Sequence, residues 1–184
     1  MSLQKRLGNN LSDAGIARVS MSQDGCLYNV GGQNLTTLTT SEEVLATITV
    51  QRNLLYNVRE GLYIWAFGTT KNNGNNKQVR IRLVGLTGSI VADTGAVALN
   101  NGAFMVEGWI LRAGANSSEL VGRTAMGTTP TTSYLADVTT AMATLGSVVI
   151  TGATPTAAGD LILKGYRVCY VSRGGVMTAG GVLA

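Results

Sequence analysis

The chain has 184 residues, of which 45% are hydrophobic and only 13% are charged, and its formal net charge is +4. This length suits one ordinary core and is short for two. Free monomers usually carry charges on about a quarter to a third of their surface. The low charge therefore predicts a surface covered by copies of the chain or by a larger assembly, rather than a monomer coated with Thr, Asn, Ser and Gly.

Several classes of protein are disfavoured at once. No apolar stretch approaches the ~20 residues of a membrane-spanning helix, and the N-terminus lacks the apolar region of a secretory signal. The 14 basic residues are scattered and form no Lys/Arg run. We therefore expect neither a membrane nor a nucleic acid as a partner.

Residues 1–43 differ from the rest of the chain. Their hydrophobic residues are sparse and follow neither helical nor strand periodicity. We predict an extended N-terminal arm, with one short strand near residues 26–30. Such a segment beside a compact domain usually lies on a partner or is disordered. The candidate partner-binding residues of the arm are Lys5, Arg6 and Arg18.

The clearest strands of the domain, which we place at residues 44–184, flank an Asn-rich loop. Residues 62–67 form an apolar run rich in aromatic residues, and residues 78–83 alternate strictly between polar and apolar. Alternation with a period of two is typical of a half-buried strand. Residues 69–77 between them are nearly all turn formers.

Further strands are predicted by β-branched content and by flanking turn signals, over residues 44–50, 84–93, 103–112, 119–125, 147–151 and 161–171. Residues 127–133 are predicted to be a loop. Residues 134–145 are the one helical candidate after the arm, although their Thr and Val content indicates a strand or loop equally well. Eight or nine short strands without alternating helices predict an all-β antiparallel sandwich, and we favour a jelly roll.

The sequence offers little catalytic chemistry. It contains no histidine, which removes the commonest general base and the usual zinc ligands. Glu107 and Glu119 lie in strands that flank one hairpin and are the conceivable glycosidase pair, but we interpret both as solvated strand residues. The glycine pairs match no phosphate-loop or dinucleotide pattern. We expect no enzymatic activity, no cofactor, no metal and no small-molecule substrate.

Three basic residues near the Asn-rich loop have two interpretations. Lys77, Arg80 and Arg82 could form a positive ridge that docks an acidic partner or a nucleic acid. We favour a solvated outer strand face, on which basic residues discourage edge-to-edge pairing. Interleaved aromatic residues, expected at a site for single-stranded nucleic acid, are absent from this stretch.

The tryptophans and cysteines are interpreted structurally. Trp65 and Trp109 lie in apolar strands, so we expect core or subunit-interface anchors rather than a sugar platform. Cys26 and Cys169 show neither CxxC nor metal-ligand spacing. We favour two small buried thiols over a single long-range disulfide, which the sequence alone does not exclude.

Several segments resemble the jelly-roll proteins found on tailed-bacteriophage virions, namely LYIWAFG, KNNGNNK, QVRIRLVG, FMVEGWILRAGANSSELVG and AGDLILKGYRVCYV. The resemblance covers roughly residues 44–171. It implies a structural role, as a capsid decoration or cement protein or as a domain of a head fibre, baseplate or tail fibre. Such proteins are commonly homotrimers without a cofactor, and decoration proteins often reach over neighbouring capsid subunits with a terminal arm.

We therefore predict a capsid decoration or cement protein, located in the virion after assembly in the host cytoplasm. It would bind itself as a homotrimer, and would bind the phage major capsid protein or another virion protein through its arm and trimer base. The alternative is a tail or head-fibre component with a receptor- or glycan-binding tip, which would need aromatic residues in its loops. A small icosahedral capsid protein would need a strongly basic arm, whereas residues 1–43 carry three basic and four acidic residues.

Overall fold

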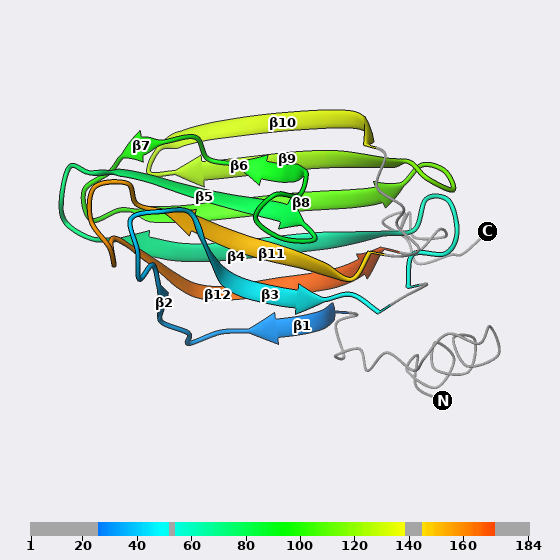
Figure 1. The fold of residues 1–184 in the computed structure, drawn as a ribbon, viewed down its shortest axis with the longest axis horizontal. Coiled ribbons are helices and arrows are strands. Elements are labelled where there is room, and N and C mark those ends of the chain that lie inside the picture. Colours follow the sequence, from blue (N-terminus) through cyan, green and yellow to red (C-terminus); the bar gives the residue numbers. More distant parts are fainter. Residues whose placement is uncertain (1–25, 52–53, 139–144, 172–184) are drawn as a thin grey trace, which may run out of the picture.

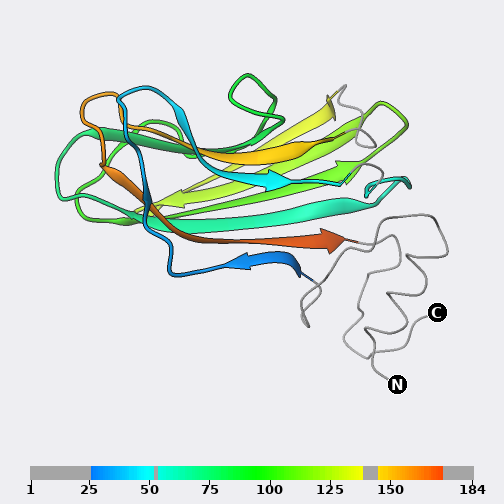
Figure 2. The ribbon, with the colours of Figure 1, turned by 60° about the horizontal axis from the view of Figure 1, so that its bottom comes forward.

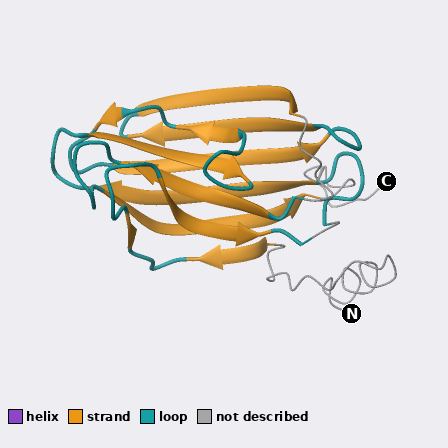
Figure 3. Cartoon of the chain, viewed as in Figure 1, coloured by secondary structure: helices purple, strands orange, loops and turns teal. Residues whose placement is uncertain are grey.

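The computed structural model describes residues 26–51, 54–138 and 145–171, and these residues form β-strands joined by loops (Figures 1 and 3). The strands are β1 (Cys26–Val30), β2 (Leu35–Thr36), β3 (Glu43–Thr49), β4 (Gly61–Thr70), β5 (Asn76–Leu83), β6 (Ile90–Asp93), β7 (Val97–Ala98), β8 (Ala103–Arg112), β9 (Ser118–Met126), β10 (Thr129–Val138), β11 (Ser147–Ala153) and β12 (Leu161–Val171). Within these ranges no helix is long and apolar enough to cross a membrane.

The strands pair in two antiparallel sheets that pack face to face (Figure 2). The larger sheet has the order β1-β12-β4-β8-β9-β10, with β2 also paired to β12. The smaller sheet has the order β3-β11-β5-β6, with β7 paired to β5. The orders β1-β12-β4-β8 and β3-β11-β5-β6 place early strands beside late ones, as two Greek keys wound into a jelly roll do. The predicted antiparallel jelly-roll sandwich is confirmed, and β9 and β10 extend its larger sheet.

The alternation seen in the sequence decides which side chains form the core. Strands β4 and β5 alternate between buried and more exposed residues along their length. Their buried side chains come from opposite sheets and join one hydrophobic cluster, namely Leu62, Ile64, Ala66, Val79, Ile81 and Leu83. Burial of each Leu, Ile or Val side chain contributes about 1.5–3 kcal/mol to the free energy of unfolding. This shared core therefore holds the two sheets together.

The largest difference from the predicted elements is β10. Residues 127–133 were expected to be a loop, but β10 begins at Thr129 after a tight turn at Gly127 and Thr128. Gly127 has a φ of 64°, which glycine adopts without strain. The chain therefore reverses at once, and the Thr-rich segment pairs with β9. Residues 134–138 belong to the same strand, so the helical interpretation is wrong there, and residues 139–144 lie outside the described residues.

A β-bulge changes which side chains of β3 are buried. Strict alternation predicts that Val44 shares a face with Ala46 and Ile48. The ladder with β11 shifts between Ala46 and Val44, so Leu45 is buried and Val44 is exposed. An extra residue at a bulge turns the following side chains to the other face, which a period of two cannot anticipate.

Gly108 lies in the middle of β8, where the two sheets meet. The ladders from β8 to β4 and β9 run through it without a shift. A β-carbon at this position would lie 2.9 Å from Cγ1 of Val91 in the facing sheet. Glycine here allows the two sheets to approach each other closely.

The N-terminal part of the sandwich extends further than predicted. Strands β1 and β2, both before residue 44, pair with β12, so the predicted domain boundary lies inside the sandwich. The short strand expected near residues 26–30 is confirmed as β1. Short edge strands form because a neighbouring strand provides their hydrogen-bond partners, so their own hydrophobic pattern predicts them poorly. Residues 1–25 lie outside the described residues, and the extended arm remains a prediction for them.

A disulfide joins Cys26 in β1 to Cys169 in β12, so the expectation of two thiols was wrong. The two residues are directly opposite each other in the β1–β12 ladder and are separated by 143 positions in sequence. Only the pairing of the first and last strands brings them together, and spacing in the sequence carries no sign of it.

Candidate functional site

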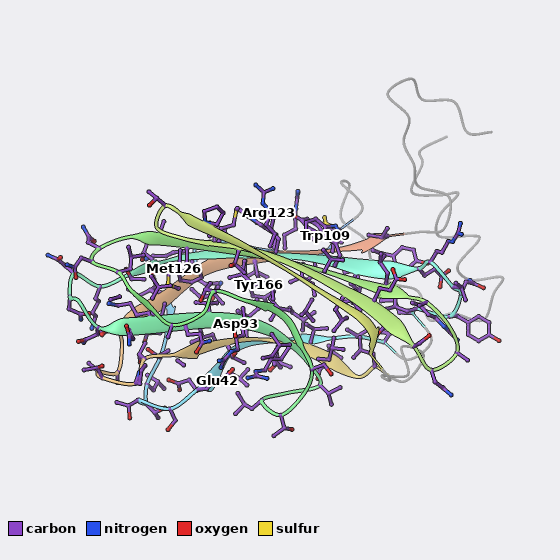
Figure 4. All side chains as sticks on the ribbon, turned by 90° about the horizontal axis from the view of Figure 1, so that it is seen from above. Glu42, Asp93, Trp109, Arg123, Met126 and Tyr166 are labelled. Atoms are coloured by element: carbon purple, nitrogen blue, oxygen red, sulfur yellow. A yellow bond between two sulfur atoms is a disulfide. The ribbon has the colours of Figure 1, made fainter. Side chains whose placement is uncertain are left out.

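The outward side of the larger sheet concentrates large apolar side chains. This surface, called the aromatic face below, consists of Tyr63, Trp65 and Phe67 on β4 and Met105 and Trp109 on β8, all partly exposed. Their strand neighbours point into the core, so alternation turns these five residues outward. In Figure 4, Trp109 lies on one side of the molecule with Arg123, and Glu42 lies on the opposite side.

The position of the two tryptophans corrects one prediction and leaves another standing. Trp65 and Trp109 lie outside the core between the sheets, so they are not core anchors. The cross-strand partner of Trp65 on β8 is Glu107, and that of Trp109 on β4 is Tyr63. Both tryptophans therefore stay available as anchors of a subunit interface, which remains a prediction.

The aromatic rings pair with one another. The ring centroids of Trp65 and Phe67 are 4.7 Å apart with an interplanar angle of 29°, and those of Tyr63 and Trp109 are 4.9 Å apart at 38°. Ring pairs at this distance cover part of each other's faces. Part of each ring face is therefore already in contact with another ring of the same chain.

Charged residues of both signs interrupt the aromatic face. Glu107 accepts a hydrogen bond from the Tyr63 hydroxyl at 3.2 Å and lies directly opposite Arg123 of β9. Burial and the nearby Glu107 carboxylate raise the pKa of Tyr63. Arg123 is exposed, and within the described residues it forms no ion pair. The guanidinium is thus available to a carboxylate of a partner.

The arrangement does not place the conceivable glycosidase residues together. Glu107 pairs with Arg123, whereas Glu119 pairs with Leu111. The two glutamate positions are four residues apart along the strand direction, or roughly 13 Å. Glycosidase carboxyl groups lie about 5–9.5 Å apart. Among the described residues no group of three or more His, Cys, Asp or Glu side chains could hold a metal ion.

The basic residues of β5 do not form a positive ridge. Arg80 contacts Glu42 at 2.6 Å and Asp93 at 2.8 Å, and Arg82 contacts Glu42 at 2.8 Å. These arginine side chains are only 19% and 12% exposed, so the solvated strand face that we favoured is also incorrect. The outer side of the smaller sheet instead carries a compact ion-pair network.

The two carboxylates of this network are held in their charged form. Burial raises the pKa of Glu42, but hydrogen bonds from Arg82 and Thr151 and the charge of Arg80 together lower the pKa below its usual value of 4.5. Burial likewise opposes ionisation of Asp93, and the hydrogen bonds from Arg80 and Gln78 outweigh it, so its pKa is below 3.8. The network stabilises the fold only while both groups are ionised.

The sign of this shift predicts a loss of stability in acid. Because the folded pKa values are depressed, the unfolded chain binds more protons below about pH 4.5, so the free energy of unfolding falls as the pH drops through the folded values. Chemical denaturation between pH 7 and pH 3 measures this fall. Glu42→Gln is expected to cost about 2 kcal/mol at pH 7 and to flatten the decline. Parallel pH profiles for the two proteins would contradict the role of Glu42.

Lys77 is fully buried, on the opposite side of β5 from Arg80 and Arg82. Its Nζ donates to the carbonyl oxygens of Asn73, Asn75 and Leu99 at 2.8, 2.9 and 2.9 Å, and to Oδ1 of Asn73 at 2.6 Å. The ammonium group therefore organises the Asn-rich loop from inside. It is a structural group and does not face solvent or a partner.

The loop that surrounds Lys77 is also tied to the end of the β11–β12 connection. The side-chain amides of Asn73 and Asn75 donate to the two carboxylate oxygens of Asp160 at 2.8 and 2.9 Å. The asparagines that predicted a loop thus also fix its shape. Alternation from residue 78 onward places Lys77 on the apolar side of β5, and this signal in the sequence could have revealed its burial.

The remaining predicted site residues, Lys5, Arg6 and Arg18, lie outside the described residues. Their role in partner binding stays a prediction. The residues that sequence reasoning missed are Glu107 and Arg123, as charged neighbours of the aromatic face. A signal existed, because both lie on the same alternating positions as the aromatic residues, but their cross-strand pairing needs the register of β8 and β9.

Comparison with protein-family models gives no match, and comparison with curated proteins gives none either. Among solved structures, the chain is similar to the lectin UEA-II complexed with galactose. The match covers 83% of this chain and 95% of the lectin chain, with 10% sequence identity and a TM-score of 0.38.

Proposed function

We propose that this protein is a non-enzymatic structural component of a phage virion, a decoration or cement protein that binds the head shell and copies of itself. The aromatic face is the observation that carries this proposal. Partly exposed Trp, Tyr, Phe and Met residues with an exposed arginine have the composition of a protein–protein interface. A cement protein needs such contact surfaces and no reaction centre.

Two further features support the same class. The jelly-roll topology agrees with the virion proteins that the sequence resembles. The disulfide between Cys26 and Cys169 suits a protein that functions outside a reducing cytosol, as proteins on virion surfaces do. In this proposal the N-terminal arm contacts the major capsid protein, and many identical sites on a shell strengthen weak single contacts.

The role of the arm is tested by neutralising its three cations. The variant Lys5→Gln, Arg6→Gln, Arg18→Gln is expected to bind undecorated phage heads about tenfold more weakly than the wild type, because each lost surface charge contact is worth about 0.2–1 kcal/mol. Cosedimentation with heads at several salt concentrations measures the change. Removal of residues 1–43 would be a poorer test, because it deletes β1, β2 and Cys26.

A matched control neutralises exposed cations elsewhere. Arg59→Gln with Lys71→Gln changes two exposed basic residues of loops at the sandwich ends and is expected to leave head binding unchanged. An equal loss of head binding in the arm variant and in this control would mean that the net charge of the protein, and not the arm, drives binding to the heads. Failure of the wild type to bind heads, together with binding to host cells or glycans, would replace the proposal with the fibre alternative.

A further inference from the structure

We propose that the outer side of β4, β8, β9 and β10, which carries the aromatic face, packs against the same side of a second copy of this chain. The two-fold axis runs parallel to the strands between β8 and β9, so β8 lies over β9 of the copy and β4 over its β10. This inference rests on the proposed structural role and names the partner of that surface. It is independent of the predicted homotrimer, because such a contact joins either two single chains or two trimers.

The charges of the face are complementary to themselves. Glu107 and Arg123 are directly opposite each other on β8 and β9. Rotation about an axis parallel to the strands and midway between β8 and β9 keeps the position of each residue along the strand direction and exchanges the two strands. It therefore brings Glu107 over Arg123 of the second copy, and Arg123 over its Glu107. A two-fold contact requires this reciprocity.

The apolar residues follow the same geometry. Trp109 is opposite Val121, and Met105 is opposite Ala125. The proposed axis places each of these larger side chains over the smaller residue of the second copy. Large side chains over small ones fill the space between two flat sheets, as they do in a sandwich core.

The size of the surface meets the requirement of a stable contact. Four strands, β4, β8, β9 and β10, overlap with their copies under this symmetry. Four strands about 4.8 Å apart and roughly ten residues long cover about 600 Å². Two copies together then bury about 1,200 Å², counted for flat surfaces without the extra area of protruding side chains. This area is at the lower end of the range for specific protein–protein interfaces.

Charge reversal tests the contact directly, without phage heads. Arg123→Glu alone brings glutamates together at both reciprocal sites, and Glu107→Arg alone brings arginines together. The dissociation constant for self-association of each variant is expected to be at least about 30-fold higher than that of the wild type, because like charges that face each other across an interface are strongly unfavourable. Light scattering over a concentration series should then show half of the wild-type mass.

An equimolar mixture of the two variants provides the decisive measurement. Each reversed residue then faces its opposite charge on the other variant, so the full mass should return. Arg59→Glu, at an exposed loop position, is the matched control and should keep the wild-type mass. Thermal unfolding of every variant identifies any loss of fold, and Trp109→Ala provides a second disruption that involves no charge.

Several outcomes would overturn the inference. A wild type that remains a single chain or a trimer at high concentration, insensitive to Arg123→Glu, would show that this face does not join copies. A mixture that stays at half mass would exclude the reciprocal contact. If the wild type does not self-associate but Arg123→Glu loses head binding, the occupant is the capsid protein, and the proposed function survives while this inference fails.

Discussion

Removal of the disulfide between Cys26 and Cys169 is expected to lower the free energy of unfolding by about 2–5 kcal/mol. The bond links residues that are 143 positions apart in a chain of 184 residues, so it restrains most of the unfolded chain. The chain-entropy relation for a loop of this size gives about 5 kcal/mol. The stabilisation by a disulfide is smaller than this value when the unfolded chain keeps residual structure, and the expected range therefore extends down to about 2 kcal/mol.

The test compares Cys26→Ser, Cys169→Ser with the wild type by chemical denaturation. The wild type measured in a strong reductant should move to the stability of the double variant, because both lack the same bond. A difference between these two would point to the serine substitutions rather than to the cross-link. Unchanged stability in both would show that the pairing of β1 with β12 holds without the bond.

Hydrogen exchange adds a local reading of the same change. Strand β1 is five residues long and pairs with β12 at the edge of the larger sheet. Without the cross-link, the amides of β1 should exchange faster than those of β4, which lies between two neighbouring strands. Equal acceleration of both strands would mean that the bond acts on the global unfolding equilibrium alone.

The parts of the fold that the sequence predicted correctly are those with a local signal. Strands β8 and β12 have the predicted bounds because each is long, β-branched or aromatic, and flanked by turn residues. The same alternation placed Val79 and Ile81 on one face of β5, and both are fully buried. Period two is a property of the strand itself, so it is visible without any partner.

The parts that failed depend on partners far away in sequence. Strand β10 is Thr-rich and looked like a loop, and it is a strand because β9 provides its ladder. Glu42 belongs to a pair of adjacent glutamates, and nothing near it indicates that Arg80 and Arg82 lie within reach. Trp65 and Trp109 were expected to be core or subunit-interface anchors, and the sequence left the two roles open because a strand with two apolar faces does not tell which side its own sheet buries.

The substitution Lys77→Met is expected to destabilise the protein by about 2–5 kcal/mol. Methionine keeps much of the apolar length of the side chain but removes the ammonium group. Four oxygen atoms of Asn73, Asn75 and Leu99 then lose the ammonium donor. Oδ1 of Asn73 keeps the Asn75 N–H and the Leu99 carbonyl keeps the Thr70 hydroxyl, so the loss falls mainly on the carbonyl oxygens of Asn73 and Asn75. Each buried polar atom left without a partner costs about 1–3 kcal/mol, and partial relaxation of the loop keeps the sum below the simple total.

Lys71→Met is the matched control, because Lys71 is exposed at the start of the same loop and should change stability by less than about 0.5 kcal/mol. Chemical denaturation in low and high salt compares the two. The Lys77 effect should persist in high salt, since a fully buried charge is screened far less than an exposed one. A cost below about 1 kcal/mol for Lys77→Met would show that the loop keeps its shape without the ammonium group. The connection from β4 to β5 would then be set by its asparagines and Asp160 alone.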